Sequence, residues 1–129
     1  GITQNPETKN YAMVLDYAEN GSLRNYLDAN SCIQSNWKTK INDLRYIACG
    51  LSVIHKKELI HRDLHIGNIL RFKYNASITD MGLCKPANYN VLEKNIFGVL
   101  PYIAPEILRG QNYTKASDIY SFGIIMYEV

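Results

Sequence analysis

Hydrophobic positions in this chain fall into short runs and one long periodic stretch. From Trp37 to Ile54 the apolar side chains recur every three or four residues, which places them on one face of a helix of roughly five turns. A shorter stretch after Ser22 shows the same spacing, and Ser22 itself is a suitable N-cap. The pattern therefore predicts one long helix and a short helix before it.

One compact apolar run and two shorter segments are too short for helices and contain residues that favour strands. They cover residues 11–17, 69–72 and 77–79, and the pair Tyr74-Asn75 between the last two predicts a turn. These runs are interpreted as short strands.

Polar or aperiodic segments separate these elements. Residues 1–10 are polar and contain the turn signal Asn5-Pro6. Residues 30–36 and 83–97 show no clear period, so loops are expected there.

The last part of the chain predicts two further helices. A short one should end at Gly110, because glycine suits the end of a helix. A second, apolar one follows Thr114–Ser117 and is still apolar at Val129. The chain also opens on Gly1 rather than Met, so we expect a piece of a longer protein.

Composition argues against several classes of protein. Hydrophobic residues make up 47% of the chain and the net charge is only +2, so nothing marks it as a binder of nucleic acid or of a membrane surface. The longest apolar runs are far too short to span a bilayer. The three cysteines, Cys32, Cys49 and Cys84, lack C-x-x-C spacing, which argues against a disulfide framework and favours a reducing compartment, the cytoplasm.

Polar side chains suited to catalysis and metal binding lie in the stretch from Ile60 to Leu70. Asp63 and Asn68 stand five residues apart in a short polar loop, and a second carboxylate follows at Asp80. A carboxylate can accept a proton from a hydroxyl, and an amide oxygen can bind a hard cation such as Mg²⁺. Two carboxylates and an amide around one pocket suit phosphoryl transfer.

Several motifs occur in a fixed order. They are His61-Arg62-Asp63, Asn68, Asp80-Met81-Gly82 and Ala104-Pro105-Glu106. Together they resemble the eukaryotic-type protein kinases, from about residue 11 to the end. The resemblance implies an α+β, protein-kinase-like fold, mainly the helical large lobe and incomplete. Residues 1–129 would form a partial kinase domain, with the end of the small lobe and the hinge at 1–21 and part of the large lobe at 22–129.

The resemblance also assigns roles to the polar residues. Asp63 would be the catalytic base, and Asn68 and Asp80 would hold the Mg²⁺ that bridges the phosphates of ATP. Asp118 would hold the backbone of the catalytic loop. The implied partners are ATP and a protein substrate, with no nucleic acid and no membrane segment.

The adenine site follows from the same resemblance. Leu15 would be the gatekeeper, the backbones of Asp16 and Ala18 would bind the adenine edge, and Leu70 would form the floor beneath it. These residues surround the expected hinge between the lobes.

Three positions depart from the family pattern. His65 stands where serine/threonine kinases carry a lysine that contacts the γ-phosphate. It is therefore a candidate nucleotide-binding residue, although a neutral imidazole supplies less positive charge than the lysine would. Met81 replaces a phenylalanine, and Val99 replaces the usual threonine. The segment up to Tyr102 still resembles serine/threonine kinases more than tyrosine kinases, so Ser/Thr hydroxyls are the expected acceptors.

Regulation has two possible forms. Arg62 would face a phosphorylated residue of the activation segment. Between Met81 and Tyr102 there is no Ser or Thr, and Tyr89 is the only hydroxyl in the variable part. Either Tyr89 is the switch, or the segment orders without phosphorylation, which is the favoured interpretation.

Three alternatives remain open. The chain could be a pseudokinase scaffold, because the Gly-rich loop and strand lysine of the small lobe are absent from it; for the same reason we expect it to be inactive alone. It could be a small-molecule phosphotransferase of the aminoglycoside or choline kinase kind, which usually lacks an Ala-Pro-Glu segment. It could also bind a metal through His61 and His65.

Overall fold

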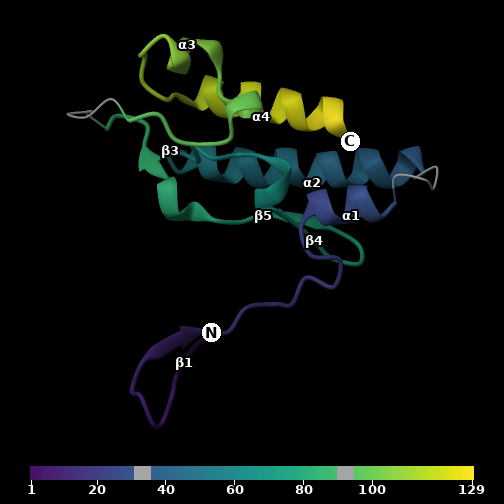
Figure 1. The fold of residues 1–129 in the computed structure, drawn as a ribbon, viewed down its shortest axis with the longest axis vertical. Helices are drawn as coiled ribbons and strands as arrows, with labels where there is room; N and C mark the ends of the chain where they lie inside the picture. Colours follow the sequence, from purple (N-terminus) through teal and green to yellow (C-terminus); the bar gives the residue numbers. More distant parts are fainter. Residues whose placement is uncertain (31–35, 90–94) are drawn as a thin grey trace.

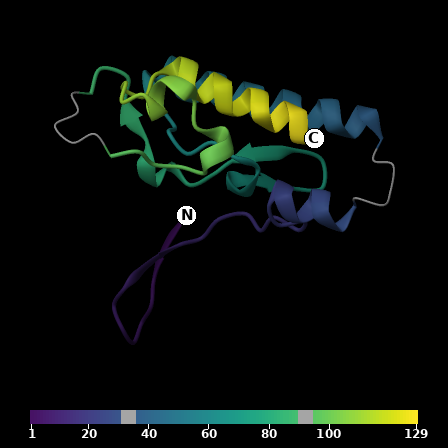
Figure 2. The same ribbon diagram turned by 45° about the horizontal axis from the view of Figure 1, so that its top comes forward.

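The computed structural model describes three stretches of the chain: residues 1–30, 36–89 and 95–129. At its centre is the long helix α2 (Trp37–Lys56), and helix α4 (Lys115–Glu128) runs alongside it (Figure 1, Figure 2). The short helix α1 (Leu23–Ala29) precedes α2. The predicted long helix, and the short helix before it, are confirmed.

Polar caps determine where two of these helices begin. Ser22 accepts a hydrogen bond from the backbone N–H of Asn25 at 3.2 Å, as expected of the N-cap of α1. Thr114 and Ser117 form a reciprocal capping box at the start of α4. Each cap satisfies a backbone donor that the first helical turn leaves free, which contributes about 1 kcal/mol.

Short strands form three separate antiparallel pairs within the described residues. They are β1 (Ile2–Gln4) with β2 (Tyr11–Met13), β3 (Leu59–Ile60) with β6 (Lys85–Pro86), and β4 (Ile69–Arg71) with β5 (Ala76–Ile78). The β4–β5 hairpin confirms the two strands and the turn predicted there, to within one residue. The β3–β6 pair was not predicted, because two residues per strand are too few to show a period.

The described residues also form four short helical turns. They are η1 (Ile66–Asn68), η2 (Met81–Leu83), η3 (Leu100–Tyr102) and α3 (Pro105–Leu108). Gly110 follows α3 with a φ of +84°, in the left-handed region where glycine is favoured. The predicted end of this helix is therefore confirmed.

Buried side chains anchor the loops that carry the candidate chemistry. Leu64 and Ile66 are 1% and 4% exposed, and both pack in a cluster with residues of α1, α2, β4 and α4. A second cluster joins Ile60 to Ile103 and Ile107 around the start of α3. The polar residues between these anchors are thus held on a rigid base.

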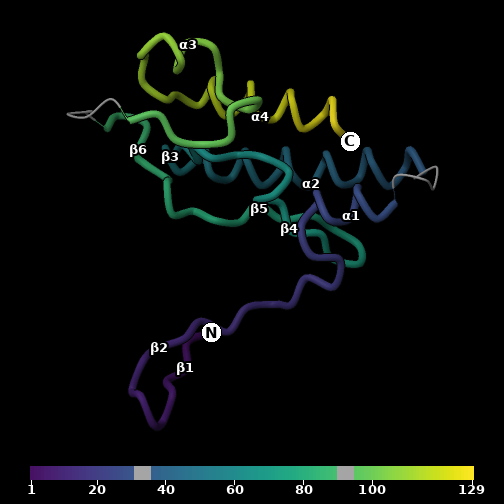
Figure 3. Tube along the Cα trace, in the orientation of Figure 1, coloured from purple at the N-terminus to yellow at the C-terminus, as the bar shows by residue number. Residues whose placement is uncertain are grey.

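The N-terminal residues differ from the prediction. The strand expected over 11–17 ends at Met13, and its partner β1 lies within 1–10, where only a turn was expected. Both strands are fully exposed, and the hairpin extends away from the helices (Figure 3). A hairpin without a buried face has no periodic hydrophobic pattern, so the sequence carried no signal for β1.

Helix α2 also differs in its first turns. Trp37 and Ile41 are 73% and 57% exposed, although both were predicted on the buried face, whereas Asp43 is 2% exposed. The Asp43 carboxylate pairs with the guanidinium of Arg71 at 2.9 Å. The first turns of α2 thus bury a charged side chain that is paired with β4, and leave Trp37 and Ile41 exposed.

Parts of the predicted loops at 30–36 and 83–97, and Cys32 with them, lie outside the described residues. Cys49 and Cys84 are free thiols. Among the described helices, none is both long enough and apolar enough to cross a membrane.

Candidate active site

Asp118 on α4 holds the backbone of the loop after β3. Its carboxylate, 1% exposed, accepts the backbone N–H groups of His61 at 2.8 Å and Arg62 at 3.0 Å. The same carboxylate lies 2.9 Å from Nε2 of His55 on α2. Arg62 has a φ of +73°, a conformation that costs a non-glycine residue free energy. The role expected of Asp118 thus agrees with its contacts.

The His61 side chain connects this loop to the segment after β5. The imidazole is fully buried, with Nε2 3.0 Å from the carbonyl oxygen of Thr79 and Nδ1 accepting the N–H of Asp63 at 3.3 Å. These contacts require the tautomer that carries its proton on Nε2. Both ring nitrogens are engaged, which argues against the alternative of a metal held by His61 and His65. In the described part of the chain, no group of three or more His, Cys, Asp or Glu could hold a metal.

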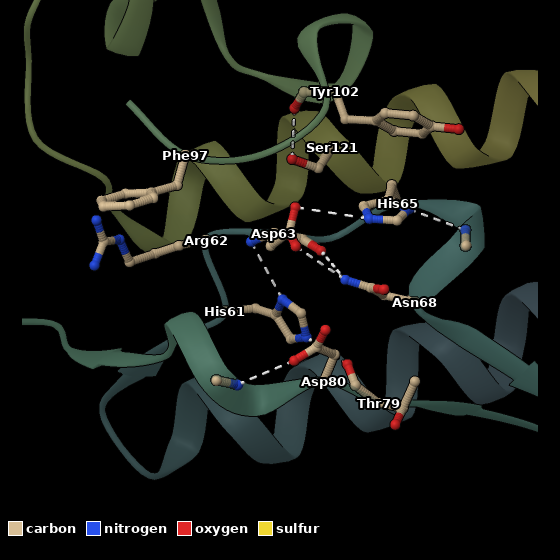
Figure 4. A network of polar contacts seen from close by, with 12 residues as sticks. His61, Arg62, Asp63, His65, Asn68, Thr79, Asp80, Phe97, Tyr102 and Ser121 are labelled. Carbon is tan, nitrogen blue, oxygen red and sulfur yellow. Dashed lines mark hydrogen bonds and ion pairs between the residues drawn. The ribbon is translucent and has the colours of Figure 1, made fainter. Parts of the chain in front are cut away.

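Asp63, His65 and Asn68 come together in the loop, as Figure 4 shows. The amide nitrogen of Asn68 donates to the Asp63 backbone carbonyl at 2.9 Å and to its carboxylate Oδ2 at 3.1 Å. His65 Nε2 lies 3.7 Å from the other carboxylate oxygen, Oδ1. The Asp63 carboxylate is therefore oriented from one side and still partly open to solvent.

The electrostatics of His65 differ from those of the lysine it replaces. Burial lowers the pKa of the imidazole, and the nearby charge of Arg24 lowers it further, against the opposing effect of Asp63. Its Nδ1 accepts the backbone N–H of Gly67 at 3.0 Å, which favours the neutral ring with the proton on Nε2. At neutral pH this position offers a hydrogen-bond donor rather than a full positive charge.

Asp80 and Asn68 lie at the open end of the β4–β5 hairpin. Thr79, next to Asp80, donates its N–H to the backbone carbonyl of Asn68 at 2.9 Å. Asp80 has a φ of +58° and an exposed carboxylate, and the amide oxygen of Asn68 points away from Asp63 (Figure 4). A carboxylate oxygen and an amide oxygen are ligands that suit Mg²⁺, so this donor set fits the expected ion.

The residues expected around adenine are only partly brought together. The chain just after Ala18 pairs with β4, because Gly21 accepts the N–H of Arg71 at 2.9 Å and Ser22 forms a bridge with Leu70. Leu70 therefore lies beside the end of the expected hinge. Leu15, 74% exposed, and the exposed Asp16 precede this contact on an extended segment. Their roles stay predictions.

Three aromatic rings enclose the Arg62 side chain. Its guanidinium carbon lies 5.1, 5.0 and 4.8 Å from the ring centroids of Tyr89, Phe97 and Tyr113, respectively, and the residue is 8% exposed. The Tyr113 hydroxyl exchanges hydrogen bonds with both the N–H and the carbonyl of Phe97. We call Tyr89, Phe97 and Tyr113 the aromatic box. The faces of these rings attract the cation, while the buried Nε of Arg62 has no hydrogen-bond partner among the described residues.

The aromatic box could not be predicted from the sequence, because its three members share no period and stand on different segments. Aromatic residues near an expected activation segment were the available signal. The close approach of Gly98 to Asp63 was also not predicted. Gly98 has a φ of +106°, and a Cβ built on it would lie 3.4 Å from Asp63 Oδ1. This places the segment before η3 directly against the candidate base.

Comparison with known proteins agrees with this geometry. A family model described as the protein kinase domain matches residues 2–129. The cold-responsive protein kinase 1 of Arabidopsis thaliana is 37% identical over 128 residues, which cover 91% of this chain and 33% of that protein. A probable serine/threonine-protein kinase of Dictyostelium discoideum, gdt4, is 35% identical over 125 residues, covering 92% of this chain and 8% of that protein. The chain thus spans at most a third of these relatives, and it belongs to the protein kinase family.

Proposed function

We propose that the protein containing this chain transfers the γ-phosphoryl group of ATP to Ser or Thr hydroxyls of proteins. The observation that carries the proposal is the Asp63 carboxylate, which Asn68 orients and which lies against Gly98. A carboxylate held in this way can accept the proton of an incoming hydroxyl. The names of the plant and Dictyostelium relatives support the kinase activity, and the second also supports the Ser/Thr acceptor.

Each polar residue would contribute one part of the reaction. Asp63 orients the acceptor hydroxyl and takes its proton. Asn68 and Asp80 would hold Mg²⁺, which would neutralise charge on the phosphates. The backbones of Asp16 and Ala18, with the Leu15 and Leu70 side chains, would hold adenine.

The neutral His65 favours one second candidate, a pseudokinase that binds nucleotide without transferring phosphate. A hydrogen-bond donor stabilises a developing negative charge less than an ammonium does. Incorporation of labelled phosphate separates the two candidates, because a pseudokinase would bind Mg·ATP but label no protein.

The direct test is Asp63→Asn in the full-length protein, with Glu7→Gln on the exposed N-terminal hairpin as the matched control. Asp63→Asn should reduce phosphoryl transfer by at least about a hundredfold while Mg·ATP affinity stays within a few fold. Asp80→Asn should in addition weaken the Mg²⁺-dependent part of nucleotide binding. Transfer at the wild-type rate in Asp63→Asn would show that another group is the base.

Analysis of the phosphorylated amino acids tests the acceptor. Phosphoserine or phosphothreonine is expected in the products. Phosphotyrosine alone would overturn the assignment to Ser/Thr, and labelling of a small alcohol but of no protein would favour the small-molecule phosphotransferases.

A further inference from the structure

A groove lies between the first half of α2 and the turn of the β4–β5 hairpin. Its volume is about 490 Å³. The lining residues are Lys38, Thr39, Ile41, Asn42, Arg45, Arg71, Lys73 and Tyr74. We call this feature the α2 groove. Of the described residues that line it, four have cationic side chains and none has a carboxylate, although the chain as a whole carries a net charge of only +2.

Most of this positive charge has no internal counter-charge. Arg71 is neutralised by the buried Asp43, at 2.9 Å. Within the stretches that the structure describes, Lys38, Arg45 and Lys73 form no ion pair with a carboxylate. Lys73 is exposed and lies over the ring of Tyr74, and Arg45 contacts the neutral Asn42 side chain and the ring of Tyr46. These cations remain available to an anionic ligand.

The start of α2 adds to the positive potential. The helix is 20 residues long and has no acidic residue in its first turn, so the positive end of its dipole is not compensated. Lys38 and Thr39 in that turn line the α2 groove. The N-terminal end of α2 and the lysine side chains therefore both make the electrostatic potential of the α2 groove more positive.

Exposed apolar side chains lie among the cations. Ile41 is 57% exposed and Tyr74 is 73% exposed, and both line the α2 groove. The side-chain amide of Asn42 donates to the backbone carbonyl of Tyr74 at 3.2 Å, which fixes the two walls relative to each other. A ligand that uses the whole groove must combine negative charge with an apolar side chain.

We propose that the α2 groove binds an acidic segment of a partner protein, in which Asp or Glu residues flank an apolar side chain. A nucleic acid would be expected to need a wider strip of cations and would leave Ile41 without a matching contact. The groove is at the turn of the β4–β5 hairpin, whereas Asn68 and Thr79 are at its open end. A bound peptide would therefore leave the candidate phosphoryl-transfer site free, so this inference does not depend on the proposed activity.

Fluorescence anisotropy on the full-length protein tests the proposal. The probe is a labelled peptide with acidic pairs on both sides of a central Leu, and the control peptide carries Asn and Gln in place of the acids. The acidic peptide should bind, and Lys38→Gln with Lys73→Gln should weaken it about fivefold, as expected for two exposed charge contacts. Ile41→Ser should weaken it about threefold through the lost apolar contact.

The matched control is Lys56→Gln with Lys57→Gln, which removes the same charge at the other end of α2, where both lysines are also exposed. This variant should bind the acidic peptide like the wild type. Equal binding of the neutral peptide, or equal weakening by the two double variants, would overturn the proposal. So would tighter binding of single-stranded DNA or of phosphatidylserine vesicles that is insensitive to Ile41→Ser.

Discussion

At the scale of single residues, Gly98 determines how the chain passes Asp63. Its φ of +106° is strained for any residue with a side chain, although a Cβ there would make only ordinary contacts, the nearest at 3.4 Å. Gly98→Ala should therefore lower the free energy of unfolding by about 1–2 kcal/mol and reduce phosphoryl transfer.

Gly123→Ala is the matched control for this change. A Cβ at Gly123 would meet nothing within 4 Å, and the residue lies inside α4. It should be neutral or stabilising by up to about 1 kcal/mol, because alanine favours helices. Chemical denaturation measures the free energy of unfolding of both variants. Equal changes in Gly98→Ala and Gly123→Ala would show that the positive φ of Gly98 does not affect stability.

The charge of His65 gives a second prediction at this scale. Because burial lowers the pKa of His65 in the folded chain below 6.5, the unfolded state binds more protons. The contribution of this residue to stability is then present above pH 6.5 and is lost as the pH falls below that value.

An NMR titration of the His65 imidazole should give a pKa below 6.5. Arg24→Gln should raise that pKa, and Asp63→Asn should lower it further, because these two charges act in opposite directions. A His65 pKa at or above 6.5 would contradict the lowering of this pKa by burial.

At the scale of elements, α4 positions the candidate catalytic loop after β3 through the carboxylate of Asp118. Asp118→Ala would leave the two N–H groups of His61 and Arg62 buried without an acceptor, so we expect a loss of about 3 kcal/mol in stability. Asp118→Asn keeps one acceptor oxygen and should lose about half as much. Denaturation curves check both, and equal stability of Asp118→Ala and wild type would show that the loop does not depend on α4.

A second prediction at this scale concerns the role of the aromatic box in the expected activation segment, between Met81 and Tyr102. Tyr89→Phe keeps the ring that faces Arg62, so transfer activity should stay within about twofold of wild type, also after phosphatase treatment. Tyr113→Leu removes a ring and both hydrogen bonds to Phe97, and should reduce activity severalfold. Loss of activity on Tyr89→Phe and on dephosphorylation would instead identify Tyr89 as a phosphorylated switch.

At the scale of the whole molecule, the N-terminal hairpin and the helical part should differ in stability. Both strands of the hairpin are fully exposed, whereas α2 and α4 share a buried cluster with Ile47 and Ile125. A two-stranded hairpin alone is marginally stable in water. Hydrogen exchange on the 129-residue chain should therefore be fast in β1 and β2 and much slower in the second half of α2, and uniform protection would contradict this division.

The same division explains how much the sequence could predict. Segments with a buried face, such as α2 from Ile47 onward and the β4–β5 hairpin, follow their hydrophobic pattern. The residues of the catalytic loop were predicted from motif order, and Asp63, His65 and Asn68 do come together. The hairpin, the Asp43–Arg71 ion pair and the aromatic box depend on contacts between distant residues that leave no local period.

Enclosure of Arg62 has a consequence for how a cell would control this protein. In a kinase whose activation segment becomes ordered only after phosphorylation, another kinase determines when that segment becomes ordered. Here the rings of Tyr89, Phe97 and Tyr113 already surround the guanidinium, although its buried Nε has no hydrogen-bond partner among the described residues. If the segment orders without phosphorylation, its order would depend on the packing of these three rings on Arg62 and not on a phosphate added by another enzyme.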